Sequence, residues 1–170
     1  MRLICLNGWG GKLHDELVPY ISLSDPDILC LQEVVHTPAA EEDWLTYRDH
    51  GIELPQRANF LRDVADALPD HVAIFCPAAQ GDLWHGTTRY FSQWGLATFV
   101  RKSIAIVAQA QGFVHGTFSA DGYGDHPLSR TGNAIRVFDF ATGQTAVIAH
   151  MHGLRDLDGK HDHAPRLAQA

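Results

Sequence analysis

Two apolar runs near the start of the chain each lead into a polar side chain. The first, Leu3–Leu6, is followed by Asn7, and the second, Ile28–Leu31, is followed one residue later by Glu33. Unbroken apolar runs of this length are typical of strands that are covered on both faces of a sheet. Between them, apolar side chains recur at helical spacing. A strand at 2–6, a helix at about 12–23 and a strand at 28–33 predict a layered α/β domain.

The rest of the pattern predicts one further helix and several strands. An amphipathic stretch at about 57–68, ended by Pro69, favours a helix. Two apolar stretches around a turn at 141–144 favour a hairpin, and Pro165 is typical of the first turn of a last helix. The expected strands are 71–76, 95–100, 103–109, 133–140 and 145–150, and the expected irregular segments are 36–56, 77–94, 112–132 and 151–163.

The length and the charge balance narrow the class of protein. A chain of 170 residues suits one domain, residues 1–170, with a core of its own. No apolar run reaches the ~18 residues that a membrane helix needs, so we expect no membrane span. The formal net charge is −7, and no stretch is rich in Lys and Arg, which disfavours long nucleic acid as a partner. A small phosphate ester bound through a divalent cation suits this balance better, because the metal supplies the positive charge.

The cysteines favour a reducing compartment. Cys5, Cys30 and Cys76 are odd in number and form no Cys-x-x-Cys pair. Two of them lie in apolar strands, where a thiol acts as a small hydrophobic group. The apolar stretch after Met1 is too short and wrongly flanked for a signal peptide. We therefore expect reduced cysteines and a cytoplasmic protein.

Asn7 and Glu33 are the first candidates for chemistry, because each stands where a predicted strand ends. Polar side chains at such places, beside Gly-rich turns, often form the sites of α/β proteins. A carboxylate and an amide held on rigid strands suit a hard divalent cation. The alternatives are a structural salt bridge for Glu33 and a turn-forming role for Asn7 before Gly8.

A second set of candidates lies in the second half of the chain. His150 and His152 have the His-x-His spacing of some zinc sites, although Gly153 to Asp156 do not complete the usual zinc motif. Zinc hydrolysis at His150 and His152 is therefore an alternative function. Otherwise His152 is expected in a solvated loop. Arg130, in a Gly-containing loop, is a candidate to bind a phosphate. An aromatic group is expected either to line a substrate groove or to pack under a loop: Trp84, Tyr90, Phe91 and Trp94.

Taken in order, these pieces resemble the endonuclease/exonuclease/phosphatase superfamily. The segments that carry the resemblance are Leu6-Asn7-Gly8-Trp9-Gly10, Asp27-Ile28-Leu29-Cys30-Leu31-Gln32-Glu33, Gly95-Leu96-Ala97 with Arg101, the strand ending at His150, and Arg166 with Gln169. The resemblance implies a DNase-I-like α/β fold, a four-layer sandwich of two sheets with helices outside. It also implies hydrolysis of phosphate esters with Mg²⁺ or Mn²⁺, with Glu33 as a metal ligand. Asn7 would be a further ligand or a phosphate contact, and His150 would be the catalytic histidine at the phosphate.

The chain also departs from the family's pattern. It contains neither the Asp-x-Asn nor the C-terminal Ser-Asp-His of the family's second half. We therefore expect the N-terminal part of such a domain, incomplete at its C-terminus and inactive on its own. A non-catalytic fragment is the corresponding alternative function. Half a sandwich would expose a large apolar face, so self-association is expected. The sequence leaves open whether the substrate is that of a nuclease, a phosphodiesterase or a phosphatase.

Overall fold

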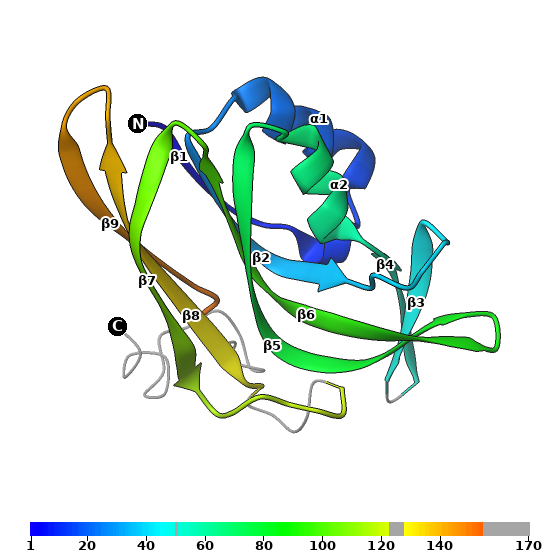
Figure 1. Cartoon of the computed structure of the whole chain (residues 1–170). Helices are drawn as coiled ribbons and strands as arrows, with labels where there is room; N and C mark the ends of the chain where they lie inside the picture. The colour runs from blue at the N-terminus through cyan, green and yellow to red at the C-terminus, as the bar shows by residue number, and fades with distance from the viewer. Residues whose placement is uncertain (50, 123–127, 155–170) are drawn as a thin grey trace.

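The computed structural model describes residues 1–49, 51–122 and 128–154. They form two sheets and two helices (Figure 1). The larger sheet has six strands in the order β1-β2-β6-β5-β3-β4, and the smaller is antiparallel in the order β7-β8-β9. The elements are β1 (Leu3–Asn7), the 3-10 turn η1 (Trp9–Gly11), α1 (His14–Ser24), β2 (Ile28–His36), β3 (Trp44–Asp49), β4 (Ile52–Arg57), α2 (Phe60–Ala67), β5 (His71–His85), β6 (Thr88–Arg101), β7 (Ile104–His115), β8 (Arg130–Asp139) and β9 (Gln144–Met151).

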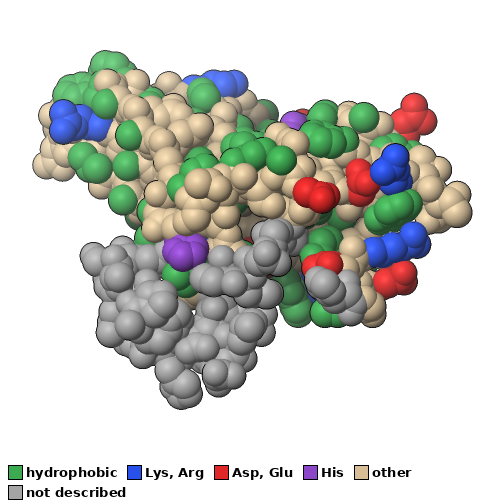
Figure 2. Space-filling model, turned by 90° about the horizontal axis from the view of Figure 1, so that it is seen from below, with side chains coloured by type: hydrophobic (Ala, Val, Ile, Leu, Met, Phe, Trp, Pro, Cys, Tyr) green, Lys and Arg blue, Asp and Glu red, His purple; other side chains and the backbone are tan. Residues whose placement is uncertain are grey.

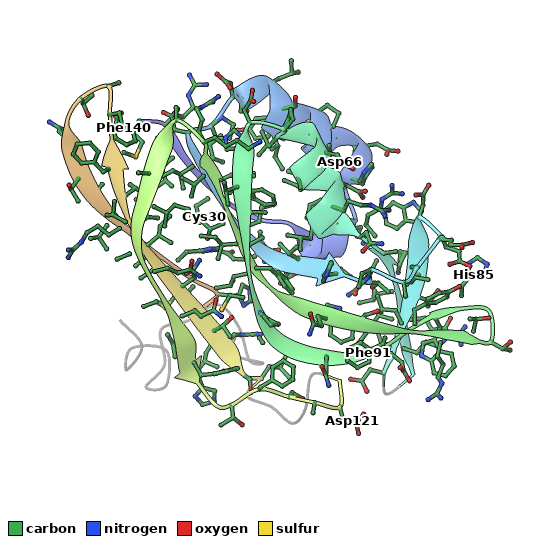
Figure 3. The ribbon with its side chains drawn as sticks, in the orientation of Figure 1. Cys30, Asp66, His85, Phe91, Asp121 and Phe140 are labelled. Carbon is green, nitrogen blue, oxygen red and sulfur yellow. The ribbon has the colours of Figure 1, made fainter. Side chains whose placement is uncertain are left out.

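Two buried clusters separate three layers. On one face of the larger sheet, α1 and α2 cover a core that includes Leu31, Phe60 and Phe99. On the other face, the smaller sheet covers a second core that includes Cys30 and Val137. Figure 3 shows Cys30 between the two sheets. The predicted two-sheet α/β sandwich with outer helices is thus confirmed, and among the described residues the helices lie on one side of it.

The first three elements follow the predicted strand–helix–strand order. β1 and β2 are parallel, with Asn7 opposite Gln32, so β1 ends beside the middle of β2, which continues past the expected end at residue 33 to His36. The predicted hairpin is also confirmed, because β8 and β9 pair antiparallel around the turn before Gln144. The helix that is expected to begin at Pro165 lies outside the described residues.

Two segments predicted to be irregular are strands instead. Within 36–56, β3 and β4 form a hairpin. Within 77–94, β5 and β6 continue their pairing as far as His85 and Thr88, with a bulge between Pro77 and Ala79. Both hairpins extend beyond the helices (Figure 1). The ends of the segment 112–132 also belong to strands, β7 and β8.

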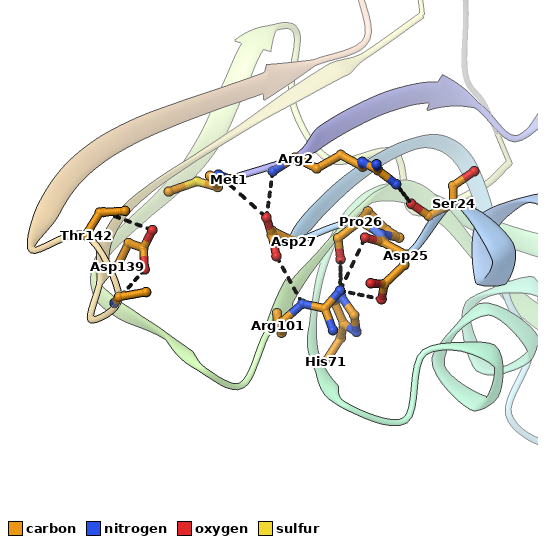
Figure 4. Close-up of polar contacts among 11 residues, drawn as sticks. Met1, Arg2, Ser24, Asp25, Pro26, Asp27, His71, Arg101, Asp139 and Thr142 are labelled. Atoms are coloured by element: carbon orange, nitrogen blue, oxygen red, sulfur yellow. Dashed lines mark hydrogen bonds and ion pairs between the residues drawn. The ribbon is translucent and has the colours of Figure 1, made fainter.

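A polar network fastens the start of the chain to the larger sheet (Figure 4). Asp27 accepts hydrogen bonds from the backbone N–H of Arg2 at 2.6 Å and from Arg101 Nε at 3.1 Å. Arg101 also donates to Asp25 Oδ1 at 2.5 Å and to the carbonyl of Pro26 at 3.0 Å. The turn between α1 and β2 is thereby tied to the end of β6.

The surface differs between the two ends of the molecule. Seen from below, charged side chains gather at the end with the β3–β4 and β5–β6 hairpins, whereas the end with β7–β9 shows more hydrophobic side chains (Figure 2). On the smaller sheet Val107, Phe140 and Val147 are 55%, 70% and 64% exposed, and Phe140 projects from the turn between β8 and β9 (Figure 3). Neither helix in the described part of the chain is long and apolar enough to cross a membrane.

Candidate active site

The structure brings Asn7 and Glu33 into direct contact. Because β1 and β2 run parallel with Asn7 opposite Gln32, Asn7 lies beside the residues that follow Leu31. Asn7 Nδ2 donates a hydrogen bond to Glu33 Oε1 at 2.9 Å. The backbone N–H of Gly8 donates to the carbonyl of Gln32 at 2.8 Å, and this bond holds the end of β1 against β2. The two polar residues singled out by the pattern therefore share one site.

Glu33 stands at an irregularity of β2. The pairing register with β6 shifts between Leu31 and Val34, and Glu33 has a φ of 54°. A residue other than glycine in this left-handed region costs about 1–3 kcal/mol and persists only where its surroundings enforce it. Bulges of this kind often redirect a side chain beside an active site. Here the bulge gives Glu33 a side chain that is 40% exposed within an otherwise buried strand.

Asn7 orients Glu33 through its amide nitrogen. The backbone N–H of Trp9 donates to Asn7 Oδ1 at 2.8 Å. The backbone N–H of Trp9 needs an acceptor, and the ionised carboxylate of Glu33 can only accept hydrogen bonds. These two partners therefore fix the orientation of the Asn7 amide. The Asn7 oxygen therefore faces Trp9 rather than Glu33. The predicted metal-ligand role of Asn7 would require the amide to turn and lose the bond from Trp9.

His152 belongs to this site, contrary to its expected place in a solvated loop. It follows the end of β9, and its Nε2 lies 3.5 Å from Glu33 Oε1 and 3.5 Å from Asn7 Nδ2. The hydrogen bond to His152 lowers the pKa of Glu33 below its usual value, against the opposing effect of burial. The hydrogen bond from Asn7 and the positive charges of His152 and Arg130 lower this pKa further. Glu33 is therefore ionised at neutral pH.

Arg130, the predicted phosphate contact, lies near Glu33 and belongs to a strand rather than to the expected loop. It begins β8, and with Glu33 and His152 it lines two adjoining hollows of about 50 Å³ and 350 Å³. A guanidinium beside an ionised carboxylate suits an anion such as phosphate, because it presents paired N–H donors.

His150 has a different environment from His152. It is 5% exposed and faces the larger sheet, with its Nδ1 3.5 Å from Thr98 Oγ1. Its buried Nε2 has no hydrogen-bond partner among the described residues. Burial, with a smaller effect from the charge of His152, lowers the pKa of His150 to about 4. Neither hollow at Glu33 is lined by His150, so this geometry does not support the predicted phosphate contact, and His152 stands nearer to that role.

The donor groups at the site suit a magnesium-like cation bound through one carboxylate. Among the described residues Glu33 Oε2 has no hydrogen bond, so this oxygen remains available as a ligand. Mg²⁺ characteristically keeps several waters and takes one or two carboxylates together with substrate phosphates. In the same part of the chain no three His, Cys, Asp or Glu side chains form a group that could hold a metal ion. The zinc alternative built on His150 and His152 thus gains no third ligand there.

The aromatic side chains at 84–94 take separate places. Trp84 packs under the guanidinium of Arg48, whose Cζ lies 5.4 Å from the ring centroid. Phe91 is 57% exposed on the distal part of β6 (Figure 3). Trp94 is buried, lines both hollows and donates from Nε1 to Gln56 Oε1 at 2.7 Å. Of the four expected groove residues, Trp94 is therefore the one that contacts the site.

The comparisons with known proteins agree with this fold. A model of the Endonuclease/Exonuclease/phosphatase family matches residues 6–168. An endonuclease/exonuclease/phosphatase family protein from Leptotrichia buccalis has a TM-score of 0.54 at 15% identity, over 89% of this chain and 53% of its own. A protein of this family from Bacteroides vulgatus has a TM-score of 0.52 at 16% identity, over 89% and 51%. The mannosyl-6-phosphatase of Bacteroides thetaiotaomicron has a TM-score of 0.52 at 16% identity, over 85% and 44%.

The chain therefore spans about half the length of these solved structures. No curated protein matches its sequence.

Proposed function

Because the chain belongs to the endonuclease/exonuclease/phosphatase family, we propose that it is a Mg²⁺- or Mn²⁺-dependent hydrolase of phosphate esters. The observation that supports this proposal most is the position of Glu33. Its carboxylate is held at a strained bulge by Asn7 and His152, with Arg130 beside it and an open hollow in front. Such an arrangement brings a hard-cation ligand and a phosphate-binding guanidinium to the same place.

Each side chain has a separate task in this proposal. Glu33 would hold the cation through Oε2, and the cation, when bound, would neutralise charge on the phosphate and on the leaving oxygen. Arg130 binds non-bridging oxygens of the phosphate, and Asn7 keeps the Glu33 carboxylate in one orientation. His152 lies close enough to Glu33 to contact a phosphate that the cation would hold there. In the reaction, water forms a bond to phosphorus, the ester P–O bond breaks and the alcohol leaves with a proton.

Two considerations support a small ester as the substrate. The net charge of −7 opposes a long polyanion, and one structural neighbour is named as a mannosyl-6-phosphatase. We therefore place the chain nearer to phosphatases than to nucleases. Its departure from the family's later motifs leaves a non-catalytic phosphate-binding module as the second candidate.

Hydrolysis of model esters with a ligand-deficient variant tests the proposal. With Mg²⁺ or Mn²⁺ we expect release of nitrophenol from nitrophenyl phosphate or from bis-nitrophenyl phosphate, and loss of release with a chelator. Glu33→Gln removes the anionic ligand but keeps the shape of the side chain. We expect the rate of hydrolysis to fall by about 100-fold or more. The matched control is Glu53→Gln, which changes an exposed carboxylate of β4 that pairs with Arg48 of β3. This variant should leave the rate unchanged.

Three outcomes separate the candidates. Equal rates for wild type and Glu33→Gln would refute the assignment of the metal ligand. Activity that follows Zn²⁺ rather than Mg²⁺ would favour the zinc alternative. Saturable phosphate binding that needs Mg²⁺ and Glu33, without turnover, would favour the non-catalytic module.

Two further proposals concern the state of the protein in the cell. We propose a cytoplasmic location, which is supported by the three free cysteines Cys5, Cys30 and Cys76. We also propose self-association through the smaller sheet, because Val107 and Val147 expose apolar surface there. Sedimentation that stays monomeric up to high protein concentration would contradict the second proposal.

A further inference from the structure

The larger hollow beside Glu33 has more room than a phosphate group needs. Its volume of about 350 Å³ lies in the range of ligand pockets. Glu33, Arg130 and His152 line it together with apolar side chains from the other end of the larger sheet, which include Tyr47 and Leu54. A ligand that fills it must therefore carry a second group next to its phosphate.

Aromatic and aliphatic side chains line this additional space. Leu54 is 44% exposed, although it is a large hydrophobic residue. Tyr47 packs edge-on against Trp94 with ring centroids 6.2 Å apart, and the hydrogen bond from Trp94 to Gln56 fixes the indole. This part of the wall presents two aromatic rings and an aliphatic side chain, so it suits a flat apolar group better than a chain of hydroxyl groups.

Trp9 is the most unusual residue of the wall. It is 54% exposed and has a φ of 47°, a conformation that a residue with a side chain rarely adopts. Its backbone N–H is held by Asn7 Oδ1, and Gly11 behind it, with a φ of 74°, leaves no space for a side chain because a Cβ would lie 2.5 Å from Arg57 Cβ. Strain of this kind is concentrated at functional sites. It holds an exposed indole beside the hollow and beside Asn7.

The charges around the hollow suit an anion next to the ring. Among the described residues that line the hollow, Lys12 and Arg130 carry positive charges and Glu33 is the one carboxylate. Lys12 Nζ lies 4.1 Å from the centroid of the Trp9 ring. A cation at this distance covers one face of the indole, so a ligand ring would stack on the opposite face. The phosphate end and the ring end of a ligand would therefore find complementary groups in one hollow.

We propose that Trp9, with Tyr47 and Leu54, binds the aromatic ring of a small phosphate ester whose phosphate lies at Glu33 and Arg130. This inference rests on the proposed function and specifies its substrate class. The substrate is a phosphate ester of one planar ring or one nucleoside, and so differs from the sugar phosphate that the name of the mannosyl-6-phosphatase neighbour indicates. Stacking on an aromatic side chain contributes about tenfold to affinity in comparable sites.

Binding of non-hydrolysable phosphonates tests the inference without any need for turnover. We would titrate phenylphosphonate and methylphosphonate into the full chain with Mg²⁺ and measure both dissociation constants by calorimetry. In the wild type, phenylphosphonate should bind about tenfold more tightly than methylphosphonate. In Trp9→Ala the ratio should fall towards one while methylphosphonate binding changes by less than about twofold. Trp9→Phe, which keeps a ring, should retain most of the preference.

The controls separate this inference from the proposed function. Phe91→Ala removes a comparably exposed aromatic ring outside the hollow and should leave the ratio unchanged. Arg130→Ala should weaken both phosphonates alike. If both phosphonates bind equally well, or if Trp9→Ala weakens both alike, the ring site is refuted and the phosphate site stands. If neither phosphonate binds, both proposals are wrong.

Discussion

The buried imidazole of His150 predicts that mild acid destabilises the protein. His150 lies between the two sheets, beside Thr98 and Asn133 and near His152, and its pKa is lowered to about 4 by burial and then by His152. In the unfolded chain the pKa of a histidine is about 6.5. A group whose pKa is depressed on folding stabilises the fold fully above its unfolded pKa. This contribution is lost as the pH falls from 6.5 towards 4.

The magnitude follows from the two pKa values. At pH 7.5 almost no unfolded His150 is protonated, so the contribution is complete. At pH 5 the unfolded chain binds nearly one proton more than the folded chain at this position, and the free energy of unfolding should be lower by about 2 kcal/mol. Near pH 4 and below, the loss should approach about 3 kcal/mol.

Urea unfolding at pH 7.5, 6 and 5 measures this loss. His150→Gln keeps a neutral side chain of similar length that does not titrate, so the difference between wild type and variant isolates His150 from the other titrating groups. The variant should lose about 2 kcal/mol less stability than wild type between pH 7.5 and 5. His85→Gln, at the exposed tip of the β5–β6 hairpin, should behave as wild type does. Parallel pH profiles for wild type and His150→Gln would refute the buried, neutral state of His150.

Three substitutions test contacts that hold the fold together, each by urea unfolding. Arg101→Ala removes the donors to Asp27 and should lower the free energy of unfolding by about 1–3 kcal/mol; no change would contradict the network. Gly11→Ala should lower the free energy of unfolding by about 2 kcal/mol or more, because a Cβ at this position clashes with its neighbours. The control Gly51→Ala, also at positive φ but in open space, should lower it by about 1 kcal/mol. Phe60→Ala empties the core under α2 and should cost about 3–5 kcal/mol, and a loss below 1 kcal/mol would show that this core is loosely packed.

The fold could be predicted from the sequence where a strand or helix buries a continuous face. β2 and the β8–β9 hairpin bury regular apolar positions, so their patterns are visible in the sequence. β1 is also apolar, but it is an edge strand rather than one covered on both faces, and only Ile4 and Leu6 pack partly against the core. β4 was missed because most of its side chains are exposed and it contains Pro55. The distal half of the β5–β6 hairpin was missed for a related reason. It extends beyond the helices, and Pro77 and Gly81 interrupt the pattern at and beyond a bulge.

The sequence identified Asn7 and Glu33 because both follow apolar runs. The choice between His150 and His152 depended on where β9 ends, which the sequence does not show. Side chains two residues apart on a strand face the same side, so only the resemblance to the family favoured His150 over His152 as the catalytic histidine. β9 ends at Met151. His150, still paired with Asn133, is therefore held inside the sandwich, whereas His152, beyond the last pair, reaches the bulged carboxylate of Glu33. The end of β9 and the bulge of β2 thus decide which histidine can take part in chemistry. The contact that results, between His152 and Glu33, joins residues more than a hundred positions apart in the sequence.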